Sequence, residues 1–325
     1  MHFLFRPENH LTPIRRWARA CGARLNIDGE TFALSVIHRR RAVELRPKFS
    51  IRTDTQQIAY VNTFPEVGAF VGWMSYQFKR WAAASDKLAF KELFSAHGLR
   101  VPRLLAAPPG EDFLIKSRTG SFGVQVKGPF CSASSAVADA LAPGEFCEQY
   151  IVGRPAKVWY WNDQPVAIEL VAQPYLMGDG RRTVAELLAQ PRGSMDFEYK
   201  PDAAQPMLAW QQLDTDSLPA QGEKVWLGFK YATPYDRVDF ADRDVWAKSS
   251  EKLRAQAGEA GKVAFQSIPR EIRAATMFTL DAVVDADDHA WWLEMNSHAM
   301  VHPRVYAPML SELFGQSVDP RTSVS

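Results

Sequence analysis

Cysteine is scarce in this sequence. Among 325 residues there are three cysteines, Cys21, Cys131 and Cys147, an odd number at wide spacing. A disulfide framework needs paired cysteines, and a structural zinc site needs closely spaced cysteine or histidine ligands. Neither is indicated. Free thiols fit a reducing compartment, so a cytoplasmic protein is expected.

An excess of charge of one sign is also absent. Lys and Arg together number 38 and Asp and Glu 37, which leaves a net charge of +1. A nucleic-acid-binding protein normally carries a strong basic field, so no nucleic-acid partner is expected. No stretch reaches the roughly 18 consecutive apolar residues of a membrane span, so no membrane partner is expected either. Small-molecule chemistry is favoured.

Apolar residues, by contrast, are plentiful. They make up 46% of the chain, and its length predicts about two domains. The first part mixes a helical pattern at 11–22 with strand-like runs at 31–40 and 42–47. The aromatic run at 70–84 is expected to form a further helix. Together these patterns predict an α/β fold.

A new module is expected to begin near residue 85. Ser85 is the predicted N-cap of a helix, and Gly98 is its predicted C-cap. Strands follow around the glycine-containing loop of FLIKSRTGSFGVQV and at EFCEQYI. Further on, a helix is expected after Gly180 and an irregular stretch at 190–220.

Three oxygen-bearing side chains stand out near the end of the chain. Asp281 lies in an apolar strand, and the strand WWLEMN alternates so that Glu294 and Asn296 share one face. If the two strands pair, the three side chains meet. Oxygen ligands without His or Cys suit Mg²⁺ or Mn²⁺ beside substrate phosphates, which indicates a nucleotide site. The alternative is a satisfied polar cluster at a strand end, because short acidic patterns often arise by chance.

A glycine-containing loop offers a second contact with phosphate. Lys116 ends a strand, and the loop after it contains Thr119, Gly120, Ser121 and Gly123, whose backbone N–H groups can approach phosphate closely. An ordinary hairpin turn is the alternative. The spacing adds to the signal, because Lys87 lies about thirty residues earlier. A short strand, GEFCEQYIVG, lies about thirty residues later and offers backbone groups to a flat adenine ring.

In this order, the segments DKLAFKELFSAHGLRVP, FLIKSRTGSFGV, EFCEQYIVG and D…ExN resemble the ATP-grasp superfamily over residues 85–310. MGDGRRTVAELL, the later PRG and LPAQGEKVWL are similar to its glutamate-ligase branch, which includes cyanophycin synthetase and bacterial bifunctional glutathione synthetases. SMDFEYK resembles the D-x-E-x-K segment of D-alanine:D-alanine ligases. The resemblance implies an ATP-grasp fold with an N-terminal α/β domain at 1–84, a lid subdomain at 85–151 and a C-terminal subdomain at 152–325.

The resemblance also implies roles for individual residues. Lys87 and Lys116 would contact the ATP phosphates, and Lys200 would act at the transferred phosphate. Adenine would be held by Glu148, Gln149, Tyr150 and Ile151. The loop that closes over the triphosphate would contain Thr119, Gly120, Ser121, Gly123 and Val124. Mg²⁺, or Mn²⁺, would be bound by Asp281, Glu294 and Asn296.

The chain departs from the family pattern at several positions. Pro155 stands where an acidic residue usually binds ribose. Lys157 replaces an arginine that assists the reacting groups, which keeps the charge but loses the bidentate fork. The family has a basic residue in the strand before GDG, and IELVAQPYLMGDG has no counterpart to it. The family's threonine-glycine-glycine segment is replaced by FKYATPYDR. Arg304, after the terminal asparagine, would face the acyl substrate.

The function that the resemblance implies is ATP- and Mg²⁺-dependent carboxylate–amine ligation through an acylphosphate, with release of ADP. The substrates would be amino acids or peptides, and a homodimer is one expected state, since ligases of this superfamily are often dimers. An ATP-grasp phosphotransferase and a degenerate nucleotide-binding scaffold subunit are the alternatives. His289 is expected to have a structural hydrogen-bonding role instead of a chemical one.

Overall fold

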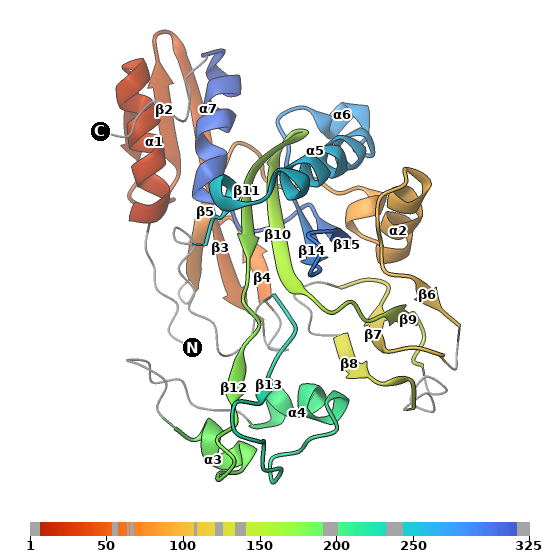
Figure 1. Ribbon diagram of the computed structural model, residues 1–325. Coiled ribbons are helices and arrows are strands. Elements are labelled where there is room, and N and C mark those ends of the chain that lie inside the picture. Colours follow the sequence, from red (N-terminus) through yellow and green to blue (C-terminus); the bar gives the residue numbers. More distant parts are fainter. Residues whose placement is uncertain are drawn as a thin grey trace.

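The computed structural model describes residues 7–53, 58–63, 65, 68–106, 109–120, 126–133, 141–190, 201–231 and 243–316. It is a mixed α/β structure built around several antiparallel sheets (Figure 1). The predicted α/β fold is confirmed. Among the helices of these residues, none is long and apolar enough to cross a membrane.

The N-terminal part forms a five-stranded antiparallel sheet with the order β1-β2-β3-β4, in which β5 also pairs with β3. Helix α1 ends at Gly22, whose positive φ of 69° suits glycine. Helix α7, from the far end of the chain, packs beside α1 (Figure 1). The elements are α1 Glu8–Cys21, β1 Arg24–Ile27, β2 Leu34–His38, β3 Arg41–Arg52, β4 Ile58–Val61, β5 Ala69–Met74 and α7 Tyr306–Phe314.

The prediction of a helix at 70–84 is wrong. The first part of this run is strand β5, and only a short 3-10 helix, η1 Ala82–Ala84, follows. Every residue of β5 is buried, because the strand is covered on both faces and therefore carries a continuous apolar run instead of an alternating one. Gly72 has a φ of +121° and lies so close to Val301 that a Cβ atom would meet it at 2.5 Å. The close contact between Gly72 and Val301 packs the N-terminal sheet against the loop after Asn296.

Helix α2 Lys87–Ala96 begins one residue later than the predicted cap implies. Asp86, not Ser85, is the N-cap, since its carboxylate accepts hydrogen bonds from the backbone N–H groups of Leu88 and Ala89. His97 takes the C-cap position, and the predicted Gly98 follows it with a φ of +71°.

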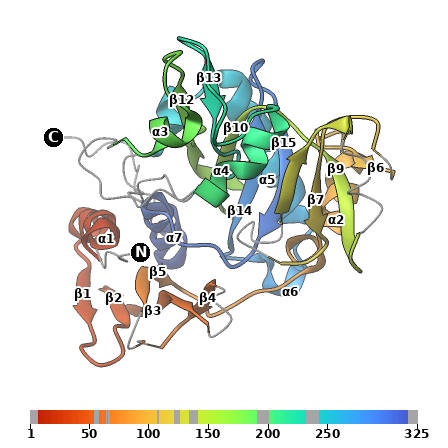
Figure 2. The ribbon, with the colours of Figure 1, turned by 90° about the horizontal axis from the view of Figure 1, so that it is seen from below.

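A four-stranded sheet with the order β6-β9-β7-β8 follows α2. Figures 1 and 2 place this sheet and the N-terminal sheet on opposite sides of the rest of the molecule. Its strands are β6 Leu104–Leu105, β7 Phe113–Ser117, β8 Val126–Phe130 and β9 Glu145–Gln149.

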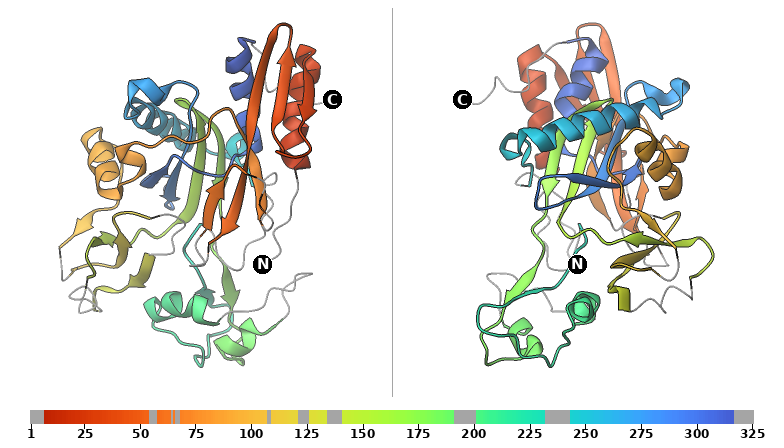
Figure 3. Two further views of the ribbon diagram at one scale, coloured as in Figure 1. Left: turned by 180° about the vertical axis from the view of Figure 1, so that it is seen from behind. Right: turned by 45° about the vertical axis from the view of Figure 1, so that its right-hand side comes forward.

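The central sheet is four-stranded and antiparallel, with the order β11-β10-β14-β15. Its faces differ: Trp159 of β10 belongs to the core shared with the N-terminal sheet, whereas Tyr160 belongs to the core shared with α5 and α2. Figure 3 shows α5 running across this second face. The elements are β10 Arg154–Trp161, β11 Gln164–Leu170, η4 Trp246–Lys248, α5 Glu251–Gln266, α6 Arg270–Arg273, β14 Met277–Val284, β15 Ala290–Asn296 and η5 Pro303–Val305.

A small unit with its own apolar core lies between β11 and η4 in the sequence. The predicted helix after Gly180 is confirmed and begins with a capping box formed by Thr183 and Glu186. The irregular stretch expected at 190–220 is partly wrong, because residues 201–210 form a helix whose Ala204 and Leu208 fill that core. The elements are β12 Tyr175–Met177, α3 Val184–Leu188, α4 Pro201–Trp210 and β13 Lys224–Trp226.

Candidate active site

Four charged side chains form a row across the central sheet. In the strand registers, Glu169 lies opposite Lys157, Lys157 opposite Asp281, and Asp281 opposite Glu294. Direct partners in antiparallel strands project from the same face, so the four side chains share one face of the sheet. Trp159, two residues after Lys157, packs toward the N-terminal sheet. The charged row therefore faces the same side of the molecule.

The predicted pairing of the two acidic strands is confirmed. Asn296 Nδ2 donates to Asp281 Oδ2 at 3.3 Å, so the three predicted metal ligands meet. Burial raises the pKa of Asp281 to about 6; Lys157 counteracts this rise, and the neighbouring Glu294 adds to it. Two repelling carboxylates and an amide oxygen on one face are a donor set that fits a hard divalent cation.

Asp281 and Glu294 each form an ion pair with a different lysine. Lys157 Nζ lies 2.5 Å from Asp281 Oδ1, and Lys87 Nζ lies 3.0 Å from Glu294 Oε2. Burial raises the pKa of Glu294, but Lys87 and other lysines outweigh burial and hold it below its usual value. The site is therefore close to electrically neutral in this state.

The start of α2 is bound to the glycine-containing loop. Lys87 Nζ donates to the carbonyl of Gly120 at 2.6 Å, and its backbone N–H donates to the carbonyl of Arg118. Arg118 pairs with the cap residue Asp86 at 2.6 Å. Gly120 has a φ of +106°, and Thr119 is exposed beside it. Lys87 therefore joins this loop to Glu294. The predicted loop residues Ser121, Gly123 and Val124 lie outside the described residues.

Glu148 bridges two lysines between β9, β7 and α2. Its carboxylate lies 2.5 Å from Lys116 Nζ and 2.6 Å from Lys91 Nζ, and all three residues are buried. Burial raises the pKa of Glu148, but the two lysines outweigh burial and lower it overall. Lys91 was missed in the sequence, although its i+4 spacing from Lys87 places both on one helix face. The Glu148 side chain contacts lysines, so only its backbone is left for the predicted adenine contact.

The residues after β9 offer an apolar surface and a backbone donor. The N–H groups of Gln149 and Tyr150 are used within the sheet, donating to the carbonyls of Arg103 and Asp112. The Tyr150 ring packs against Trp210 at 5.2 Å and Phe229 at 5.8 Å between ring centroids. The N–H of Ile151 has no protein acceptor among the described residues.

Glu169, at the far end of the charged row, was also missed. It is fully buried and accepts a hydrogen bond from the Tyr231 hydroxyl. Burial raises its pKa to about 7, and Tyr231 opposes the rise. Lys157 Nζ lies 5.0 Å from the centroid of the Tyr231 ring, so Tyr231 contacts both Lys157 and Glu169. The only sequence signal is a charge in the apolar run PVAIELVAQ.

The sequence also singled out Arg304, Pro155 and Lys200. Arg304 is exposed at η5 and pairs with Asp244 Oδ2 at 3.1 Å. Pro155 is buried inside β10 opposite Val283, and its apolar ring offers no hydrogen bond to ribose. Lys200 falls outside the described residues.

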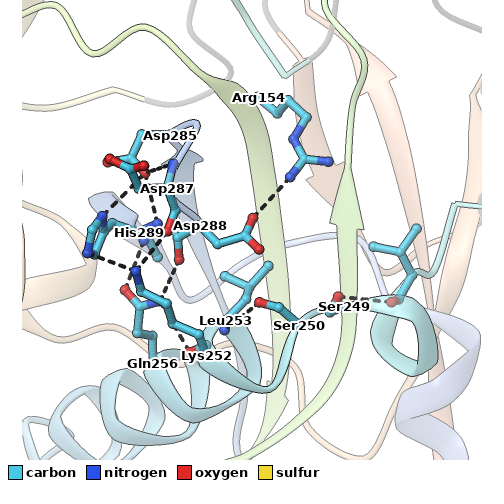
Figure 4. A network of polar contacts seen from close by, with 12 residues as sticks. Arg154, Ser249, Ser250, Lys252, Leu253, Gln256, Asp285, Asp287, Asp288 and His289 are labelled. Atoms are coloured by element: carbon cyan, nitrogen blue, oxygen red, sulfur yellow. Dashed lines mark hydrogen bonds and ion pairs between the residues drawn. The ribbon is translucent and has the colours of Figure 1, made fainter.

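A second group of candidate metal ligands occupies the turn between β14 and β15 (Figure 4). Donor atoms of Asp285, Asp287 and His289 lie within 4.8 Å of one another. Asp285 accepts hydrogen bonds from Trp291 Nε1 at 2.8 Å and from the N–H of His289 at 2.9 Å, and Lys252 Nζ contacts His289 Nε2 at 2.9 Å. These bonds hold the turn on α5. The structural hydrogen-bonding role predicted for His289 is confirmed.

No family model and no curated protein sequence matches the chain. Among solved structures, it is similar to a bifunctional glutathione synthetase from Pasteurella multocida, with 17% identity and a TM-score of 0.40 over 90% of this chain and 41% of that one. A D-alanine–D-alanine ligase from Bacillus anthracis has 12% identity and a TM-score of 0.40 over 72% of this chain and 67% of that one. The ATP-grasp ligase PsnB, complexed with a minimal precursor, has 16% identity and a TM-score of 0.39 over 72% and 62%. The chain thus spans less than half the length of the glutathione synthetase.

Proposed function

We propose that the chain is an ATP-grasp ligase that uses ATP and Mg²⁺ to join a carboxylate to an amine. One observation carries this proposal: Lys87, Lys116 and Lys157, from three separate elements, lie around the carboxylates of Asp281 and Glu294. Cations and a divalent ion gathered at one point are what an enzyme needs to bring a triphosphate and a carboxylate together against their repulsion.

In this proposal, the nucleotide lies between the β6-β9-β7-β8 sheet and the central sheet. Adenine packs on the surface formed by Tyr150 and Phe229, and Ile151 donates its backbone N–H to the ring. The phosphates lie toward Lys116 and Lys87, below the loop that begins at Thr119. The domain division proposed is the one expected from the sequence, at 1–84, 85–151 and 152–325.

Asp281, Glu294 and Asn296 would hold Mg²⁺, which when bound neutralises phosphate charge as a Lewis acid. Lys157 would then contact the transferred phosphoryl group and the reacting carboxylate. Attack of that carboxylate on the γ-phosphorus forms a carboxyl–phosphate bond and releases ADP. Attack of the amine on the resulting acyl carbon forms the amide and releases inorganic phosphate. The β6-β9-β7-β8 sheet would keep water away from the activated acyl group.

The test is an assay of ATP consumption with Mg²⁺ across pools of amino acids, dipeptides and acidic peptides, with ADP and AMP separated and product masses recorded. The proposal predicts ADP formation that depends on both a carboxylate and an amine, with a product lighter by one water than the two combined. A phosphorylated product formed without an amine would indicate a phosphotransferase. Nucleotide binding without turnover in every pool would indicate a scaffold subunit.

A further inference from the structure

Lys48 of β3 is a buried lysine with few partners. Only 3% of it is exposed, and its Nζ donates a 2.5 Å hydrogen bond to the carbonyl of Ala299, three residues after Asn296. The same Nζ lies 4.5 Å from the centroid of the Tyr60 ring. Within the part of the chain that the structure describes, no carboxylate oxygen lies within 4.0 Å of it. An ammonium group removed from water without an anion is costly, and burial accordingly lowers the pKa of Lys48 well below its usual value. An anionic ligand beside its Nζ would favour the charged form.

Lys79 of the same protein is a useful comparison, because its ammonium group has an acceptor for each of its donors. It also lies over a tyrosine, with Nζ 4.2 Å from the centroid of the Tyr76 ring. Its Nζ, however, donates to three acceptors, the carbonyls of Ala274 and Ala275 and the hydroxyl of Thr276, at 2.8, 3.1 and 2.6 Å. An ammonium group has three donors. Among the described residues, Lys48 has one protein acceptor where Lys79 has three, although Lys48 is the more deeply buried.

His298 lies beside Lys48 and contacts the Tyr60 ring that Lys48 also contacts. His298 Nε2 is buried and has no hydrogen-bond partner among the described residues. Its ring lies between those of Tyr60 and Phe78, with centroids 5.1 and 5.0 Å away. Phe78 is 44% exposed, and the exposed Arg80 lies over its ring at 4.7 Å. A line of rings and positive groups thus leads from the surface to Lys48.

This line ends beside the predicted metal ligands. Burial, and after it the charge of Asp281, raises the pKa of Tyr60, which places Tyr60 within electrostatic reach of Asp281. His298 follows Asn296 by two residues in the chain. A small molecule held at Lys48 would therefore lie next to the phosphoryl-transfer site.

We propose that Lys48, together with His298 and with Arg80 at the surface, binds a carboxylate of the substrate that does not take part in the reaction. The inference rests on the proposed ligase function and narrows its substrates to those that carry a free carboxylate besides the one activated. Two sources share this chemistry: the α-carboxylate of an amino acid or peptide that supplies the amine, and the second carboxylate of a dicarboxylic acyl substrate.

The experiment compares matched ligands in the wild type, in Lys48→Met and in Lys79→Met. Methionine keeps most of the lysine volume and removes the charge. The probes are the amino acids and dipeptides of the assay pools and their C-terminal carboxamides, with glutarate and its monoamide for the acyl source. The readouts are ADP formation with Mg²⁺ and ATP, and the shift in Tm that each probe causes.

Wild-type protein should prefer the free acids from one of the two sources by about tenfold or more in kcat/KM. Lys48→Met should remove this preference through KM, leave the KM for ATP unchanged and leave Tm unchanged or higher. Lys79→Met should lower Tm and keep the preference. A Lys48→Met protein that is destabilised and still prefers the acids would overturn the inference and leave the ligase proposal standing.

The shift in Tm separates the two proposals. If no pool supports ADP formation, the ligase function fails, and the inference is judged by binding alone. Stabilisation of the wild type by free acids, and of Lys48→Met by neither acids nor amides, would then support the carboxylate site. Equal stabilisation of both proteins, or of neither, would overturn it.

Discussion

Lys157 and Asp281 occupy directly opposed positions on β10 and β14, and Lys157 Nζ lies 2.5 Å from Asp281 Oδ1. A divalent cation bound by Asp281 would compete with Lys157 for the same carboxylate. Metal binding would then free the lysine amine to contact phosphate or the reacting carboxylate. In this account, the Lys157–Asp281 ion pair would be the resting state of the site without a bound metal ion.

Lys157→Met should therefore reduce catalysis more than it reduces ATP binding. Loss of one preorganised positive donor lowers kcat by roughly a hundredfold or more. The KM for ATP should change little, because Lys87 and Lys116 remain. Steady-state ADP release with the substrates found in the pools checks this, and Lys252→Met is the control. A variant with wild-type kcat would show that Lys157 only balances the charge of Asp281.

Glu294→Gln should weaken metal binding. The variant keeps the carboxylate of Asp281 but loses that of Glu294. The Mg²⁺ concentration for half-maximal ADP formation should therefore rise about tenfold or more. Asp287→Asn is the matched control, since it removes an exposed carboxylate from the turn group of Asp285, Asp287 and His289 instead. If Asp287→Asn changes the Mg²⁺ dependence and Glu294→Gln does not, the metal site lies in the turn.

Glu169 should make stability depend on pH. Its pKa is raised from 4.5 to about 7 by burial, so the folded protein holds a proton that the unfolded chain releases near pH 4.5. The contribution is fully present below about pH 4.5 and is lost as pH rises through about 7, amounting to about 3 kcal/mol over that window.

Glu169→Gln keeps an acceptor for the Tyr231 hydroxyl and removes the titration. Urea unfolding of both proteins at several pH values measures the difference in free energy of unfolding. Relative to the wild type, the variant should gain stability as pH rises from 4.5 to 7. A difference that stays constant across this range would show that Glu169 titrates normally.

Glu148→Gln should destabilise the protein by about 3–5 kcal/mol, because Lys91 and Lys116 would be left buried without their shared carboxylate. Adding Lys91→Met to Glu148→Gln should recover part of that loss, since one unpaired ammonium is removed. Chemical denaturation of the wild type, the two single variants and the double variant forms the cycle. Equal losses in Glu148→Gln and the double variant would show that Lys91 does not depend on Glu148.

Local patterns predicted the elements around the site well. The alternation of WWLEMN and the apolar run around Asp281 predicted two strands, and the structure pairs them with Asp281 opposite Glu294. Such signals are local, because alternation and a shared face follow from backbone geometry alone. Lys87 and Lys116 were singled out by short motifs at characteristic spacing, and their contact with phosphate stays a prediction.

The wrong and the missed predictions concern features that depend on the whole fold. The run at 70–84 was expected to be a helix because a strand buried on both faces loses its alternation, and only the packing of β5 against β3 and Val301 decides between them. Lys91 and Glu169 were missed because their partners come from other parts of the chain. Lys91 meets Glu148, and Glu169 meets Tyr231, 62 residues away. Polar contacts between residues so far apart leave no periodic signal in the sequence.

The most direct test of the ligase account follows oxygen from the substrate carboxylate. Pools of amino acids and peptides with ¹⁸O in their carboxylates are incubated with ATP and Mg²⁺ in unlabelled water, and the released phosphate is analysed by mass spectrometry. If the carboxylate attacks the γ-phosphorus and an amine then displaces phosphate, one ¹⁸O passes to inorganic phosphate for each amide formed. Amide formation with unlabelled phosphate, or ADP formation without any transfer of label, would contradict the account.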